Sequence, residues 1–224
     1  MHKKANNLNQ LLVDEDIDLD HVKMILFDID GTLSKGKLIR DILFQTLGEF
    51  KISKEIIPNL GREILNERWL IEHLRLNEAL AAKIMARYEY HFLNISSSEF
   101  KENLFDDVEG VFTELHERKK IIGIFTLRKV ELATRQIISS GLAHYIAKTS
   151  NFPNTEELQI SGSFINDRIG SDGLEEKIHQ LQLHLKYRPE VSLREIIVVG
   201  DSLETDIKAA SILNLTNMLI VRSE

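Results

Sequence analysis

Short apolar runs and amphipathic stretches alternate along much of the chain. Four runs have the length and composition of buried strands, at 22–27, 120–126, 195–200 and 217–221. Apolar residues recur every three or four positions at 130–140, 174–186 and 204–213, which predicts helices there. A further helix before the second run is marked by Val108, Val111, Phe112 and Leu115. Buried strands separated by helices predict an α/β domain whose parallel sheet is covered on both faces.

A different pattern fills the segment between the first and second strands. The chain contains neither glycine nor proline between Gly61 and Gly110, and the residues there favour helices. Helical spacing is clearest in two sets, namely Leu38, Ile39, Ile42, Leu43 and Leu47, and Leu80, Ile84, Tyr88 and Phe92 with Asn77 as N-cap. We therefore predict an all-helical domain of about four or five helices at 35–104, inserted into a core formed by 1–34 and 105–224.

Two segments have weaker patterns. Residues 158–166 (LQISGSFIN) alternate around a central Ser-Gly pair, which predicts a β-hairpin. Residues 1–20 have no clear pattern, and we expect partial disorder or a small packed helix.

Composition narrows the class of protein. The 224 residues are 43% hydrophobic and 28% charged, which is ordinary for a soluble globular chain. No apolar run approaches the roughly 18 residues of a membrane span, and no apolar stretch follows the N-terminal lysines as in a secretory signal. The absence of cysteine fits a cytoplasmic location, and the net charge of −7 argues against nucleic acid as the main ligand.

Candidate chemistry gathers where the predicted strands end. The first strand is followed by Asp28 and Asp30, the second ends in Thr126, and the third precedes Asp201, with Asp206 soon after. The carboxyl ends of parallel strands share one edge of the sheet, where ligands bind. Carboxylates crowded there repel one another unless a cation lies between them. Oxygen ligands without cysteine or histidine favour Mg²⁺.

These carboxylates allow other interpretations. Asp-x-Asp-Gly also opens a calcium-binding EF-hand loop, but that loop needs glutamate at its twelfth position, where this chain has Ile39. Taken alone, Gly200-Asp201-Ser202 is as typical of an ordinary turn as of a functional site. With Mg²⁺ and a phosphate ester, one carboxylate can act as nucleophile and another as general acid and base.

Four segments together resemble the haloacid dehalogenase superfamily. ILFDIDGTL (25–33) resembles its first motif, KIIGIFT (120–126) its second and IIVVGDSLETDIKAA (196–210) its fourth. SSGLAHYI (139–146) is similar to a Gly-Leu and aromatic element of the same superfamily. The resemblance covers about residues 22–224 and implies a Rossmann-like core with a helical cap inserted between the first two motifs.

The resemblance also implies roles for individual residues. Asp28 would be the nucleophile and a metal ligand, and Asp30 would protonate the leaving group, activate water and bind the metal through its backbone carbonyl. Asp201 would ligate Mg²⁺, Asp206 would support the metal site, and Thr126 would hydrogen-bond the phosphoryl group. Because relatives that displace halide lack the second aspartate, Asp30 indicates the phosphatase side of the superfamily.

The superfamily's third motif is a lysine that binds phosphate. Lys177 opens an amphipathic stretch 24 residues before Asp201, a spacing that resembles the superfamily pattern, although the usual following proline is replaced by Ile178. Lys148 is the competitor, 53 residues before Asp201 and ahead of the predicted hairpin. We expect Lys177 to bind phosphate; the alternative is a solvated charge on a helix.

The function implied is a Mg²⁺-dependent phosphatase that acts on a small phosphorylated metabolite through an aspartyl-phosphate. A phosphomutase on the same core and a non-catalytic ligand-binding protein remain alternatives. Substrate selection would belong to the cap, where the candidates are Arg62, Arg68, Trp69, His73 and Arg75. The sequence indicates neither the substrate nor an oligomeric state.

Overall fold

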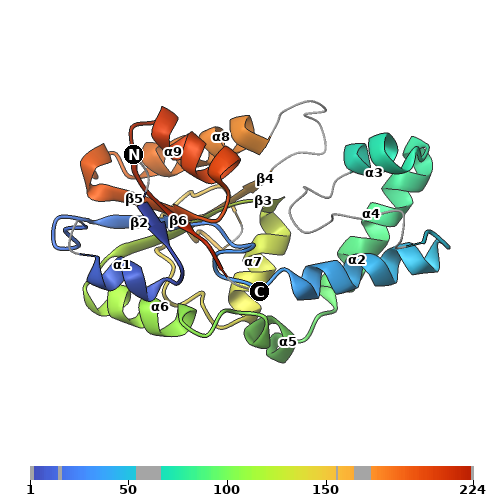
Figure 1. Cartoon of the computed structure of the whole chain (residues 1–224), viewed down its shortest axis with the longest axis horizontal. Helices are drawn as coiled ribbons and strands as arrows, with labels where there is room; N and C mark the ends of the chain where they lie inside the picture. The colour runs from blue at the N-terminus through green and yellow to red at the C-terminus, as the bar shows by residue number, and fades with distance from the viewer. Residues whose placement is uncertain (1–2, 15–16, 54–66, 155, 164–172, 223–224) are drawn as a thin grey trace.

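A six-stranded parallel sheet forms the centre of the molecule (Figure 1). The structure is a computed structural model that describes residues 3–14, 17–53, 67–154, 156–163 and 173–222. The strand order is β1-β6-β5-β2-β3-β4, and every neighbouring pair is parallel. The strands are β1 (Lys3–Ala5), β2 (Met24–Phe27), β3 (Ile121–Lys129), β4 (Ile160–Ser163), β5 (Ile196–Gly200) and β6 (Thr216–Ile220).

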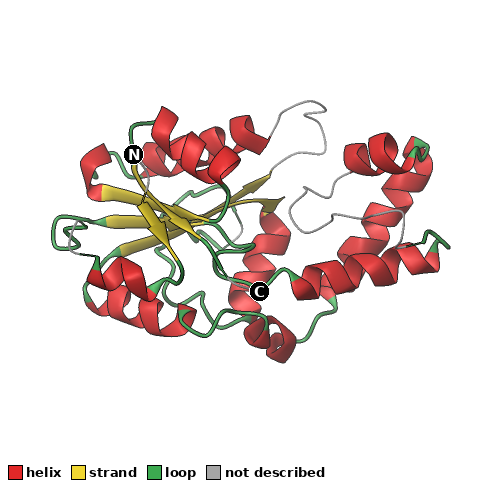
Figure 2. Cartoon of the chain, in the orientation of Figure 1, coloured by secondary structure: helices red, strands yellow, loops and turns green. Residues whose placement is uncertain are grey.

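Helices cover both faces of this sheet, as Figure 2 shows. One face packs against α1 (Asn9–Val13), α6 (Val108–Glu117) and α7 (Val130–Ser139), and the other against α8 (Gly173–Tyr187) and α9 (Lys208–Ile212). Successive side chains of β2 point to opposite faces: Ile25 and Phe27 join the first cluster, and Met24 and Leu26 the second. Burial on both faces explains why the strand is continuously apolar.

The helical insert, defined here as α2 to α5, has an apolar cluster of its own. It contains α2 (Lys37–Glu49), α3 (Glu67–Leu74), α4 (Glu78–Leu93) and α5 (Ser97–Glu102), of which α2, α3 and α4 project to one side of the sheet in Figure 1. Its cluster includes Leu47, Ile84, Phe92 and Phe100, and Leu132 of α7 joins it from the core. The insert therefore packs around a separate core and meets the α/β part at α7.

Several local predictions are confirmed. The four predicted strands correspond to β2, β3, β5 and β6, and the predicted helices to α6, α7 and α8. Asn77 is the N-cap of α4, where its side-chain oxygen accepts from the Leu80 N–H at 2.9 Å. The last predicted helix is divided, because a π-helical turn at Leu203–Ile207 precedes α9.

Two predictions at the sheet edges need correction. A hairpin turning at Ser161 and Gly162 is wrong, because both residues lie inside β4, which pairs parallel with β3. The end of that predicted hairpin, 164–166, lies outside the described residues. The N-terminal segment contains the expected small helix, α1. It also contains β1, which was not predicted because it is only three residues long and largely polar.

The observed arrangement confirms the predicted fold class, an α/β Rossmann-like core with a helical insert. The domain boundaries at 34/35 and 104/105 stay a prediction. Within the described residues, no helix is both long and apolar enough to cross a membrane.

Candidate active site

The neighbouring strands β2 and β5 bring two predicted site residues to the same edge. Phe27 of β2 is in register with Val199 of β5, and the Asp28 N–H donates to the Val199 carbonyl at 2.9 Å. Asp28 and Asp201 immediately follow these two strands. The parallel register thus explains how residues far apart in sequence become neighbours.

Asp28, Asp201 and Asp206 form a compact acidic group. One carboxylate oxygen from each lies within 4.8 Å of the others. Asp28 and Asp206 are buried, and Asp201 is half-buried. Asp206 belongs to the π-helical turn, and the Ser202 N–H donates to its Oδ2 at 3.1 Å. These hard oxygen donors fit a Mg²⁺ ion. Binding of that ion by Asp28, Asp30 and Asp201 stays a prediction.

Gly31 makes room for this group. Its φ of +83° is unfavourable for other residues, and a Cβ atom there would lie 2.2 Å from Oδ2 of Asp201. The loop after β2 therefore approaches the acidic group more closely than any side chain would allow.

Lys177 lies among the carboxylates. Its Nζ donates to Oδ1 of Asp28 at 2.5 Å and lies 2.9 Å from Oδ1 of Asp206. It also donates to the Phe125 carbonyl at 3.3 Å, and the side chain is 2% exposed. A buried ammonium is tolerated only with such partners, which contradicts the alternative of a solvated helix charge.

Burial and charge act together on these groups. Burial raises the pKa of Asp28, and the carboxylates of Asp206, Asp201 and Asp30 raise it further against the opposing effect of Lys177. Burial alone would lower the pKa of Lys177, but Asp206 and Asp28 outweigh it and hold that pKa above its usual range. The group thus has more negative charge than one lysine compensates, which favours a bound cation.

Asp30 lies apart from the acidic group in its contacts. The Arg128 Nη2 donates to both of its carboxylate oxygens, at 2.7 and 2.6 Å. Ser34 Oγ donates to Oδ1 at 3.3 Å. The sequence identified Asp30 but not its partner, although Arg128 follows Thr126 by only two positions at the end of β3.

The two remaining candidates differ in their surroundings. Thr126 is buried in β3, and its Oγ1 accepts from the Arg128 N–H at 3.4 Å. Lys148 is exposed, and it lies in a loop where its backbone pairs with Leu158. Of the two competing lysines, only Lys177 contacts Asp28 among the interactions of the described residues.

The helical insert meets the candidate site through α4. The Arg128 guanidinium lies 4.7 Å from the ring centre of Phe92, and Lys129 forms an ion pair with Glu89. Arg75, one of the predicted substrate contacts, is exposed beyond α3. Arg62 lies outside the described residues, as do the side chains of Arg68, Trp69 and His73.

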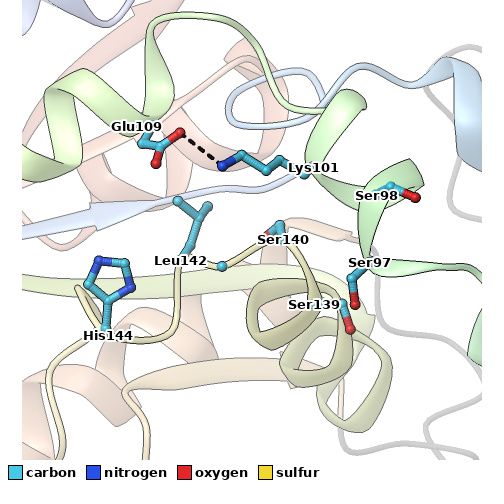
Figure 3. A pocket seen from close by; sticks show the side chains of 9 residues that line it. Ser97, Ser98, Lys101, Glu109, Ser139, Ser140, Leu142 and His144 are labelled. Atoms are coloured by element: carbon cyan, nitrogen blue, oxygen red, sulfur yellow. Dashed lines mark ion pairs between the residues drawn. The ribbon is translucent and has the colours of Figure 1, made fainter.

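A hollow of about 430 Å³ lies elsewhere, between α5, α6 and the end of α7 (Figure 3). Lys101 and Glu109 on its rim form a 3.5 Å ion pair, and Ser139, Ser140 and Leu142 line its floor. None of the predicted site residues lines it. The candidate active site is therefore the carboxylate and lysine group, not this hollow.

Comparison with solved structures supports the assignment of the fold. A predicted phosphatase from Clostridium acetobutylicum has a TM-score of 0.65 and 18% identity, with 88% of this chain and 83% of that chain covered. A protein assigned as a β-phosphoglucomutase from Thermotoga maritima has a TM-score of 0.58 and 15% identity, with 91% and 87% covered. A protein assigned as a HAD-hydrolase from Bacillus subtilis, bound to magnesium, has a TM-score of 0.59 and 17% identity, with 88% and 87% covered.

Sequence comparison identifies the family. No curated protein matches the chain. The family model for haloacid dehalogenase-like hydrolases matches residues 22–213, which include Asp28, Thr126, Lys177 and Asp201. With that match over most of its length, and with the fold described above, the chain belongs to the haloacid dehalogenase-like hydrolases.

Proposed function

We propose that this protein is a Mg²⁺-dependent phosphatase that hydrolyses a small phosphorylated metabolite through an aspartyl-phosphate on Asp28. The observation that carries the proposal is the placement of Lys177 between Asp28 and Asp206, beside Asp201. In this site a carboxylate nucleophile lies beside a lysine, whose positive charge can bind a phosphate dianion. The phosphatase and phosphoglucomutase assignments of structurally similar proteins support the same chemistry.

In the first half of the reaction, an Asp28 oxygen attacks phosphorus and the bond to the leaving oxygen breaks. Asp30 gives its proton to that oxygen, so that an alcohol departs. In the second half, water attacks phosphorus and loses a proton to Asp30, which releases inorganic phosphate and restores Asp28. Lys177 and Thr126 would hold the phosphoryl oxygens throughout.

Asp28 and Asp201 would hold Mg²⁺ together with the backbone carbonyl of Asp30, and Asp206 would support them. When bound, the ion supplies charge that offsets the carboxylates and the phosphate. The all-oxygen donor set and the short separations within the acidic group fit this ion. The magnesium bound to the similar Bacillus subtilis protein supports the choice.

We further propose that residues 35–104 form a cap over this site. The contacts of Arg128 with Phe92 and of Lys129 with Glu89 support this role, because they join α4 to the end of β3 that carries Thr126. A cap excludes bulk water during transfer and selects the substrate.

A screen of phosphorylated metabolites with Mg²⁺, read by phosphate release, tests the proposal. We expect turnover by the wild type and a loss of at least about 10³-fold in Asp28→Asn, since that variant lacks the nucleophile. Asp41→Asn, which changes an exposed carboxylate on α2, should behave as the wild type. Near-normal activity in Asp28→Asn would refute the aspartyl-phosphate.

The same screen separates the alternatives. A phosphomutase would convert a sugar phosphate into its isomer without releasing phosphate, so products are analysed as well as free phosphate. Saturable binding without turnover would instead indicate a non-catalytic binding protein.

A further inference from the structure

We propose that Arg128, at the end of β3, is a positioning residue: it packs against helix α4 and holds the Asp30 carboxylate in place. The inference rests on the proposed function, because it takes Asp30 as the group that protonates the leaving oxygen. It adds a residue that connects the acid to the helical insert.

The Asp30 side chain needs such a support. It is 41% exposed, so packing alone leaves it several rotamers. Its polar contacts among the described residues are the two short bonds from Arg128 Nη2 and one longer bond from Ser34. A general acid must lie within hydrogen-bond reach of the leaving oxygen, and a freely rotating carboxylate meets that condition for only part of the time.

Arg128 itself is firmly placed. Its side chain is 7% exposed, and its guanidinium lies over the Phe92 ring of α4. Tyr88, one helical turn earlier on α4, also faces it: burial raises the pKa of Tyr88, and the neighbouring Arg128 charge partly lowers it again. Burying a guanidinium is costly, and the ionised Asp30 carboxylate compensates it in the resting site. When one Asp30 oxygen carries the proton to be donated, the other can still accept from Arg128 Nη2.

The orientation of the Asp30 carboxylate therefore depends on the position of α4. If the insert shifts, the ring beneath Arg128 shifts with it, and the carboxylate loses its main support. Lys129 and Glu89 form a second contact between the same strand and the same helix, but Lys129 makes no contact with Asp30. Lys129 therefore offers a matched control, because its loss removes one ion pair with α4 but leaves the contacts of Arg128 with Phe92 and Asp30 in place.

Leaving-group dependence distinguishes positioning of Asp30 from other roles of Arg128. A nitrophenolate departs as a stable anion and needs no proton, whereas an alkoxide needs one. Because kcat/KM reports only the steps up to transfer of the phosphoryl group, it is insensitive to the later work of Asp30 on water. Loss of positioning should therefore lower kcat/KM for alkyl phosphates selectively.

The experiment measures kcat/KM with p-nitrophenyl phosphate, phenyl phosphate and glycerol 2-phosphate, in the presence of Mg²⁺. For Arg128→Met, which keeps an apolar side chain beside Phe92, we expect a fall of about 10²-fold with glycerol 2-phosphate and less than about fivefold with p-nitrophenyl phosphate. Phenyl phosphate should fall between them. Arg128→Lys should recover part of the loss, because it restores a cation beside Asp30, and Lys129→Met should change the three substrates equally.

Equal losses on all three substrates in Arg128→Met would overturn the inference, since they indicate phosphate binding or general damage to the fold. Unchanged rates would overturn it as well. If Arg128→Met does not fold, Arg128→Lys decides. The same ratio of variant to wild-type kcat/KM on all three substrates would refute positioning by the Nη2 contact. A wild type that hydrolyses none of the three, nor any metabolite in the screen, refutes the proposed function and the inference with it.

Discussion

Lys177 and Asp28 are 149 positions apart in the sequence, yet the lysine Nζ lies 2.5 Å from Oδ1 of the aspartate. The same ammonium lies 2.9 Å from Asp206, so one buried cation bridges two buried carboxylates, one directly after β2 and one in the π-helical turn. Removing such a cation would leave two buried carboxylates uncompensated, and its charge also prepares the site for an anionic substrate.

Replacing Lys177 by methionine should therefore damage both activity and stability. We expect a fall in kcat/KM of at least about 10²-fold, because the charge that faces the phosphoryl group is lost. Without metal, the free energy of unfolding should fall by about 3 kcal/mol, because two buried carboxylates lose their partner. Steady-state kinetics and urea unfolding measure the two effects.

Lys148→Met is the matched control for that variant. Lys148 is exposed and distant from the acidic group in its contacts, so both quantities should stay near the wild type. A normal rate in Lys177→Met combined with a slow one in Lys148→Met would show that the wrong lysine has been chosen.

Magnesium should stabilise the protein measurably even without substrate. A ligand that binds only the folded state at about 100 times its Kd adds about 2.7 kcal/mol, which for a domain of this size raises the Tm by about 5 °C or more. Thermal unfolding with EDTA and with Mg²⁺ measures the shift. Asp201→Asn should lose most of it and Asp41→Asn none; an equal shift in all three proteins would place the ion elsewhere.

Gly31 should be essential for the geometry of the acidic group. In Gly31→Ala, the new methyl group would meet the Asp201 carboxylate, so Mg²⁺ should bind more weakly in calorimetric titration. Gly141 offers the control, because its φ of +84° is nearly the same and nothing lies within 4 Å of a Cβ there. Gly141→Ala has the same backbone strain, about 1 kcal/mol, and should leave Mg²⁺ affinity unchanged. Equal loss in both variants would attribute the effect to strain.

The sequence was sufficient to predict the central strands, and the polar residues at their ends, for a physical reason. β2 and β5 are buried on both faces, so their apolar runs are unbroken, and the polar residues that follow them stand out. Asp28 and Asp201 could thus be placed at one edge of the sheet from the pattern alone. The register of Phe27 with Val199 makes them neighbours there.

Features set by tertiary contacts escaped prediction. β1 is three residues long and largely polar, so its pairing with β6 leaves no periodic signal. Ser161 and Gly162 resemble a turn, but Gly162 lies in β4 where a Cβ would meet the backbone of Arg128 and Val130. The contacts of Arg128 are with Phe92 and Asp30, which lie 36 and 98 positions away, so no local pattern relates them to it.

His184 provides a prediction about pH. It is fully buried on α8, where its Nε2 donates to the Ile124 carbonyl at 2.8 Å, and burial lowers its pKa to about 4 from the ordinary 6.5. The unfolded chain therefore takes up this proton at a higher pH than the folded protein does. Stability should fall as the pH drops from about 6.5 to 4, by at most about 3 kcal/mol from this residue.

Because the buried carboxylates also titrate in acid, the His184 contribution is measured as a difference between variants. His184→Gln keeps a donor near Ile124 but does not titrate, so its free energy of unfolding should decline less steeply than that of the wild type between pH 6.5 and 4. His179→Gln, which changes an exposed histidine of the same helix, should follow the wild type. Parallel curves for wild type and His184→Gln would mean that the folded protein protonates His184 as readily as the unfolded chain does, which its burial between α8 and β3 argues against.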